Sequence, residues 1–133
     1  MTRADNGATN RAFLFPGQGS QTVGMGRALA EAHPEARAVF EAVDDALGEK
    51  LSDLIFGGDQ ETLTLTRNAQ PALMATAVAA TRAIEAASGR SLAELCDYVA
   101  GHSLGEYSAL AASGAIAVGD TAKLLRLRGD SMQ

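Results

Sequence analysis

The sequence predicts an α/β fold in which two short strands are parallel neighbours in one sheet. Two apolar runs, at residues 12–15 and 98–100, each lead into a glycine-containing turn, as buried strands commonly do. Apolar residues at helical spacing fill much of the chain between these runs and after the second one. This order of elements is typical of parallel pairing, because parallel strands need a long crossover between them.

The first buried strand is predicted over residues 12–15, where Ala-Phe-Leu-Phe is stopped by Pro16 and Gly17. Residues 1–11 are polar and are expected to form a flexible leader before it. A loop follows at residues 17–21, and its glycines would allow backbone N–H groups to come close to a ligand. This loop is not a phosphate-binding P-loop, because neither Gly-Lys-Ser nor Gly-Lys-Thr follows it.

Helices are predicted over much of the region that follows. Apolar markers between residues 26 and 47 predict two helices rather than one, because Pro34 cannot donate an interior helix hydrogen bond but suits a first turn. Residues 51–56 form a further apolar helical turn, which ends at a pair of glycines. The clearest helix is predicted over residues 71–87, which are Ala-rich and apolar nearly all round; this indicates burial, and Gly89 is the expected C-cap.

The second buried strand is predicted at residues 98–100, directly before a glycine. Helices at residues 105–112 and 121–132 follow, and Asp120 is the expected N-cap of the last one. Two strands are too few for a finished sheet of this class, and no capping signal follows the last helix. We therefore expect residues 12–133 to be the N-terminal part of a larger domain.

The composition indicates a soluble cytoplasmic protein. The chain has 133 residues, of which 47% are hydrophobic and 20% charged, and this excludes intrinsic disorder. A net charge of −5 argues against nucleic acid or an anionic membrane as the main partner. No apolar run approaches the roughly 20 residues that span a bilayer, and residues 1–11 contain no secretory signal. The single cysteine, Cys96, excludes an internal disulfide framework.

Residues 101–105, Gly-His-Ser-Leu-Gly, match the nucleophile elbow G-x-S-x-G. The predicted strand before the motif and the predicted helix after it supply the context that such an elbow requires. In this turn small glycines avoid clashes, the oxygen of Ser103 is exposed, and the N–H of Leu104 can stabilise negative charge on a reacting carbonyl. The context favours a nucleophilic Ser103 over the alternative that small residues simply fill a tight turn.

A nucleophilic serine needs a base, and the chain has two histidines. His102 adjoins Ser103, and neighbours across such a turn point apart, which favours a packing or supporting role. His33 precedes Pro34 between two predicted helices and is most simply a surface residue. No histidine follows Ser103, so the order Ser, Asp or Glu, His cannot be completed. Either the base lies outside this chain or the site is not catalytic.

Four segments, taken together and in order, resemble the malonyl-CoA:acyl carrier protein transacylases of bacterial fatty-acid synthesis; the acyltransferase domains of polyketide synthases are close relatives. The segments are Phe15-Pro16-Gly17-Gln18-Gly19-Ser20-Gln21, Asn68-Ala69-Gln70-Pro71-Ala72-Leu73, Gly101-His102-Ser103-Leu104-Gly105-Glu106-Tyr107-Ser108-Ala109-Leu110 and Arg128-Gly129-Asp130-Ser131-Met132-Gln133. The resemblance implies part of an α/β-hydrolase-like parallel-sheet domain. A ferredoxin-like small subdomain, the remaining strands and the catalytic histidine of that family would be missing from this chain.

The resemblance also implies a ping-pong transfer, with malonyl-CoA as substrate and neither cofactor nor metal. Ser103 would take the malonyl group as an ester and pass it to the phosphopantetheine thiol of acyl carrier protein. The backbone N–H groups of Gln18 and Leu104 would form the oxyanion hole. The expected partners are therefore malonyl-CoA, acyl carrier protein and the absent C-terminal part of the enzyme, without which this chain is expected to be inactive.

The resemblance assigns substrate contacts to three further residues, Arg128, Gln70 and His102. Arg128 would pair with the free malonyl carboxylate, which a planar guanidinium matches with two parallel hydrogen bonds. From spacing alone, Arg126 and Arg128 would both be exposed charges on the last helix, and the resemblance singles out only Arg128. Gln70 would lie near the substrate, and His102 beside it.

Two other functions stay open on the sequence. The elbow alone would equally allow a serine hydrolase or thioesterase, which would release free malonate rather than hold a long-lived acyl group. The absent histidine favours a third possibility, a catalytically incomplete piece that acts only within a two-chain complex. Such a binding piece would keep its function after Ser103→Ala, whereas either enzyme would lose it.

Overall fold

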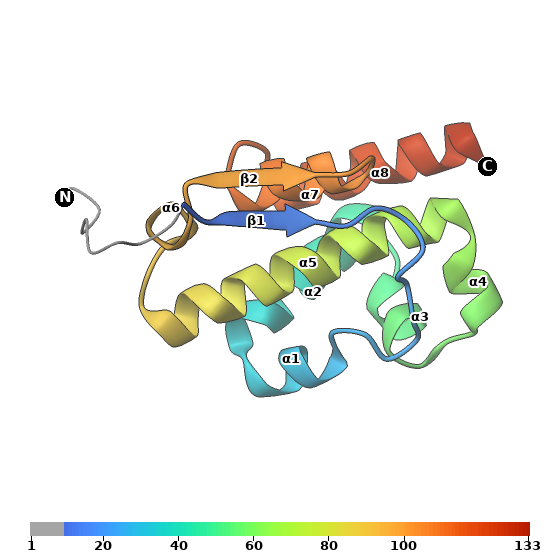
Figure 1. Cartoon of the computed structure of the whole chain (residues 1–133). Helices are drawn as coiled ribbons and strands as arrows, with labels where there is room; N and C mark the ends of the chain where they lie inside the picture. Colours follow the sequence, from blue (N-terminus) through green and yellow to red (C-terminus); the bar gives the residue numbers. More distant parts are fainter. Residues whose placement is uncertain (1–9) are drawn as a thin grey trace.

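The computed structural model describes residues 10–133 as a mixed α/β fold that consists mostly of helices around a small sheet (Figure 1). Most of the predicted leader at residues 1–11 lies outside the described residues, but the N–H of Arg11 donates to Asp97 at 3.0 Å. The elements in chain order are β1 (Ala12–Phe15), α1 (Arg27–Ala32), α2 (Pro34–Leu47), α3 (Leu51–Gly57), α4 (Gln60–Thr64), α5 (Thr66–Ser88), α6 (Leu92–Leu95), β2 (Tyr98–Gly101), α7 (Gly105–Ala112) and α8 (Val118–Met132).

The two strands pair in parallel, which confirms the prediction, with Phe15 opposite Gly101 at their carboxyl ends. The prediction that both strands are buried is wrong for one face of this sheet. Leu14 is 75% exposed and Tyr98 is 62% exposed, whereas Phe15, on the opposite face, is buried. A parallel sheet is buried on both faces only when helices cover both. Helix α7 contacts both strands, but the face with Leu14 and Tyr98 is left largely exposed among residues 10–133.

The helix boundaries agree with the sequence in part. Pro34 separates α1 from α2 and stands at the first turn of α2, and Gly89 ends α5 in the left-handed conformation, as predicted. However, α5 begins at Thr66, so Pro71 lies inside the helix instead of starting it. The predicted N-cap of the last helix is also wrong, because α8 is capped by Ala117 and Asp120 lies in its first turn, where a carboxylate still faces the positive end of the helix.

Two short helices, α4 and α6, are not predicted from apolar spacing, yet each has a capping signal. The Asp59 side chain accepts hydrogen bonds from the N–H and hydroxyl of Thr62 at the start of α4. Ser91 and Glu94 form a capping box at the start of α6, and this S-x-x-E pattern is visible in the sequence. These hydrogen bonds lower the pKa of both the Asp59 and the Glu94 carboxyl groups.

The long helix α5 forms the centre of the structure and packs against α2, α7 and α8 (Figure 1). Its alanines let these neighbours approach closely. The predicted burial of residues 71–87 is confirmed for most of the range up to Ala83, but Ile84 is 44% exposed and the end of the helix faces solvent. The final turns of α8 lie against the first turn of α5, where a Cβ added to Gly129 would be 2.5 Å from the Cα of Arg67. Among residues 10–133, no helix has the combination of length and apolar character that crossing a membrane requires.

Replacing Gly129 by alanine should therefore reduce stability. We expect Gly129→Ala to lower the free energy of unfolding by about 1–3 kcal/mol, because the new methyl group meets backbone atoms that cannot rotate away. Gly57→Ala is the matched control, since its Cβ would meet nothing within 4 Å; we expect no loss, or a gain of up to about 1 kcal/mol. Equal urea midpoints for the two variants would contradict the close approach.

Candidate active site

The turn between β2 and α7 has the geometry of a nucleophile elbow. Ser103 has a φ of 59°, and no other non-glycine residue between residues 10 and 133 has a positive φ. A Cβ on Gly101 would clash with the carbonyl group of Gly105, and a Cβ on Gly105 would clash with the carbonyl oxygen of Phe15. Both glycines of the motif are therefore needed for the turn to pass so close to its neighbours, and the Ser103 side chain is left exposed.

The loop after β1 meets this elbow, because the carboxyl ends of parallel strands lie at the same edge of the sheet. The N–H of His102 donates to the carbonyl oxygen of Phe15 at 3.1 Å. A Cβ on Gly17 would lie 2.9 Å from Nδ1 of His102, so a glycine at this position lets the loop pass directly beside the imidazole. His102 is exposed rather than packed in the core, and it adjoins both Ser103 and the start of the Gln18 loop.

Arg128 reaches the serine from α8. Its Nη2 donates to Oγ of Ser103 at 3.1 Å, and its Nη1 donates to Oε1 of Gln70 at 2.6 Å. Gln70 is fully buried on α5, and the guanidinium also lies 5.6 Å from the ring centroid of Tyr107. The structure thus brings three of the predicted site residues into direct contact, although they are far apart in the sequence.

Thr66 connects this group to the loop after β1. The amide nitrogen of Gln70 donates to the Thr66 hydroxyl at 2.9 Å, and that hydroxyl donates to Oε1 of Gln18 at 2.7 Å. The same Gln70 nitrogen lies 3.5 Å from the sulfur of Met132. Thr66 is not expected at the site from the sequence, because the helix is predicted to begin at Pro71, whereas α5 begins at Thr66 and places it one turn before Gln70.

The predicted oxyanion donors are in positions that leave them free for a ligand. Leu104 precedes α7 directly, and its side chain is 1% exposed, which anchors the turn in the core. Within residues 10–133, neither the backbone N–H of Leu104 nor that of Gln18 donates a hydrogen bond to another protein group. A backbone N–H at the start of a helix is well suited to stabilise an oxyanion.

Neither histidine is placed as a base for the serine. Among the described residues, no hydrogen bond joins an imidazole to Ser103. His33 is the C-cap residue of α1 and the N-cap residue of α2. Figure 1 shows α1 on the far side of α5 from the two strands. The arrangement can therefore present a serine oxygen and a guanidinium to one substrate, but residues 10–133 supply no histidine that would take the serine proton.

Comparison with known proteins agrees with this geometry. Residues 12–133 match the family described as "Acyl transferase domain". The chain is 52% identical over 121 residues to a malonyl CoA-acyl carrier protein transacylase of Bacillus subtilis, a match that covers 91% of this chain. The crystal structure of an acyl-carrier-protein-S-malonyltransferase from Bartonella henselae superposes with a TM-score of 0.89 at 57% identity, over 94% of this chain.

A second similar structure is that of a malonyl-transacylase in complex with a type II polyketide synthase acyl-carrier protein, with a TM-score of 0.81, 42% identity and 94% of this chain covered. In each case the chain spans well under half of the other protein. It covers 37% of the Bacillus subtilis relative, 40% of the Bartonella henselae chain and 39% of the transacylase in the complex.

The strained backbone at Ser103 leads to a stability prediction. Ser103→Gly should be more stable to urea than Ser103→Ala by about 1 kcal/mol, because a glycine adopts the left-handed conformation without the steric cost of a Cβ. Both variants lose the same hydroxyl and the same contact with Arg128. The difference between their free energies of unfolding therefore measures the cost of the left-handed backbone at residue 103. A stability of Ser103→Gly equal to or below that of Ser103→Ala would show that the turn is not strained.

Proposed function

The chain belongs to the acyl transferase domain family, and from that membership we propose that it carries the nucleophile and the carboxylate-binding arginine of a malonyl-CoA:acyl carrier protein transacylase. The observation that carries the proposal is the contact between Arg128 and the Ser103 oxygen. In a malonyl thioester, one methylene group separates the free carboxylate from the carbonyl carbon that is attacked. A cation beside the attacking oxygen is therefore within reach of that carboxylate, and it favours a diacid over an acetyl group.

The first half-reaction loads the serine. Oγ of Ser103 attacks the thioester carbonyl of malonyl-CoA and loses its proton to a base outside the described residues. The carbonyl oxygen becomes negatively charged, and the N–H groups of Leu104 and Gln18 stabilise it. The C–S bond then breaks, the CoA thiolate leaves and takes up a proton, and malonyl remains as an ester on Ser103. Throughout this step the guanidinium of Arg128 holds the malonyl carboxylate, and the buried Gln70 holds the guanidinium.

The second half-reaction transfers the malonyl group and regenerates the free Ser103 hydroxyl. The phosphopantetheine thiol of acyl carrier protein attacks the ester carbonyl, the C–O bond to Ser103 breaks, and the serine oxygen recovers its proton. The relative that is solved in complex with an acyl-carrier protein supports this acceptor. No cofactor takes part in these steps.

The rest of the fold is part of the same proposal. Residues 12–133 would be the N-terminal portion of an α/β-hydrolase-like sheet, completed by further strands and a ferredoxin-like subdomain that also bring the catalytic base. Two observations support this: the exposed apolar face at Leu14 and Tyr98, and the small share of each relative that the chain covers.

Mass spectrometry of the intact protein tests the proposed function. We compare the 133-residue chain with a hybrid protein in which it continues into the part of the Bacillus subtilis relative that it does not cover. After brief exposure to malonyl-CoA, the hybrid protein should gain one malonyl group that maps to Ser103. The chain alone should gain little, because residues 10–133 place no histidine beside the serine as a base. Ser103→Ala is the control and should gain nothing.

Two results would contradict the proposal. A hybrid protein that folds but stays unmodified would show that Ser103 is not an acyl-carrying nucleophile. Rapid release of free malonate, without transfer to acyl carrier protein, would instead identify a hydrolase.

The role of Arg128 is tested by comparing two thioesters. Arg128→Met in the hybrid protein should reduce the rate of malonyl loading by about 10- to 150-fold, because a hydrogen bond to a charged group contributes about 1.5–3 kcal/mol. Loading from acetyl-CoA should not fall, since acetyl has no carboxylate to bind. An equal loss with both thioesters would assign Arg128 a general structural role instead.

A further inference from the structure

We propose that Arg126 is a positioning residue for this site. It locks the end of α8 onto the first turn of α5, and thereby holds Arg128 and Gln70 in register beside Ser103. The consequence for substrate selection rests on the proposed function, whereas the lock itself rests on contacts within the described residues. The sequence-based view of Arg126 as an exposed charge is wrong, because only 12% of its side chain is exposed.

The lock begins with a carbonyl group that Pro71 leaves unpaired. In an uninterrupted α5, the N–H of residue 71 would donate to the carbonyl oxygen of Arg67, but a proline has no N–H. Nη1 of Arg126 donates to that same oxygen at 2.6 Å and so replaces the missing helix hydrogen bond. An interior proline is thereby tolerated one residue after Gln70, since a buried carbonyl without a partner is destabilising.

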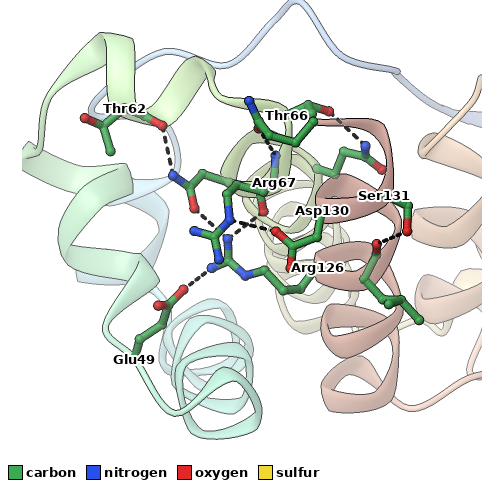
Figure 2. A network of polar contacts seen from close by, with 11 residues as sticks. Glu49, Thr62, Thr66, Arg67, Arg126, Asp130 and Ser131 are labelled. Atoms are coloured by element: carbon green, nitrogen blue, oxygen red, sulfur yellow. Dashed lines mark hydrogen bonds and ion pairs between the residues drawn. The ribbon is translucent and has the colours of Figure 1, made fainter.

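The guanidinium of Arg126 also joins two other parts of the fold, α4 and the segment after α2, to α5 and α8. Nη1 lies 2.6 Å from Oδ1 of Asn68, whose own amide donates to the carbonyl oxygen of Thr62 in α4 at 2.9 Å. Nη2 pairs with Glu49, which follows α2. Figure 2 shows Glu49 and Arg67 reaching Arg126 from different elements. Burial lowers the pKa of Arg126, but an arginine keeps its charge under such conditions, so these acceptors are needed to compensate it.

These contacts lie next to the residues that form the site. Arg126 is two positions before Arg128 on α8, and its acceptor Arg67 is three positions before Gln70 on α5. Two further contacts fix the same crossing: Nε of Arg67 pairs with Asp130 at 2.7 Å, and Gly129 fits against the backbone of Arg67. A displacement of α8 by about 1 Å is enough to reduce an oriented reaction about 100-fold. The position of Arg128 therefore depends on the pairing of Arg126 with α5.

A double-mutant cycle separates this positioning role from general stability. The variants are Arg126→Met, Pro71→Ala and both together, in the hybrid protein. Alanine at position 71 regains the N–H that can donate to the carbonyl oxygen of Arg67. The double variant therefore restores the hydrogen bond within α5 but not the contact between α8 and α5, which separates the two effects. Arg27→Met is the matched control, because Arg27 is an exposed arginine on α1 that pairs with Glu31 of the same helix. The readout is the ratio of malonyl to acetyl loading on Ser103.

Arg126→Met should lower this ratio by about 10- to 100-fold in protein that remains folded. The double variant should not recover the ratio, because an N–H at position 71 satisfies the Arg67 carbonyl but does not join α8 to α5. Arg27→Met should leave the ratio unchanged. An equal loss of both thioesters in Arg126→Met, or a double variant that regains the full ratio, would overturn the proposal. If Arg126→Met does not fold, Arg126→Lys replaces it; it keeps the charge but cannot reach all the acceptors, and it should give a smaller loss in the same direction.

Hydrogen exchange on the 133-residue chain tests the contact between α8 and α5 without an activity measurement. Arg126→Met should increase amide exchange in residues 66–70 and 128–132, and adding Pro71→Ala should restore protection at residues 66–70. Unchanged exchange in both segments would overturn the proposal. A hybrid protein that loads neither thioester, combined with this exchange pattern, would contradict the proposed function but leave the positioning role supported.

Discussion

The left-handed backbone of Ser103 is the constraint on which the rest of the site depends. A serine in this conformation must be held by its surroundings, and here the surroundings are two strands that end at the same edge and two glycines that allow the closest approach. The turn exposes the serine oxygen and leaves the N–H of Leu104 at the start of α7. The small sheet therefore serves mainly to fix one backbone turn next to the Gln18 loop.

The second requirement is that two helices far apart in sequence meet over this turn. Gln70 on α5 and Arg128 on α8 contact each other at 2.6 Å, so any shift between the helices would move the cation away from the serine. The crossing is held by polar groups rather than by apolar packing alone. Pro71 leaves the carbonyl of Arg67 without a helix donor, and Arg126 donates a hydrogen bond to it. Gly129 allows the backbones of α8 and α5 to approach closely. Substrate recognition and fold stability therefore share the same few residues.

The features that could be predicted from the sequence are those that depend on residues close together in the chain. The elbow follows from five consecutive residues, and the split between α1 and α2 follows from Pro34 alone. The start of α5 could not be predicted, because a proline is typical of a first helical turn and the arginine that pairs with the freed carbonyl of Arg67 is far away in the sequence. For the same reason Arg126 reads as a surface charge in the sequence, and Thr66 has no visible role until Gln18 and Gln70 are placed on either side of it. The roles in catalysis and substrate binding remain predictions for Ser103, Gln18, Leu104, Arg128, Gln70 and His102.

The most direct test of this account is a crystal structure of the hybrid protein after exposure to malonyl-CoA. The account predicts an ester on Oγ of Ser103, with both oxygens of the malonyl carboxylate within hydrogen-bond distance of the Arg128 guanidinium. The ester carbonyl oxygen should point to the N–H groups of Leu104 and Gln18. An ester whose carboxylate extends into solvent, with Arg128 still bound only to Gln70, would contradict it.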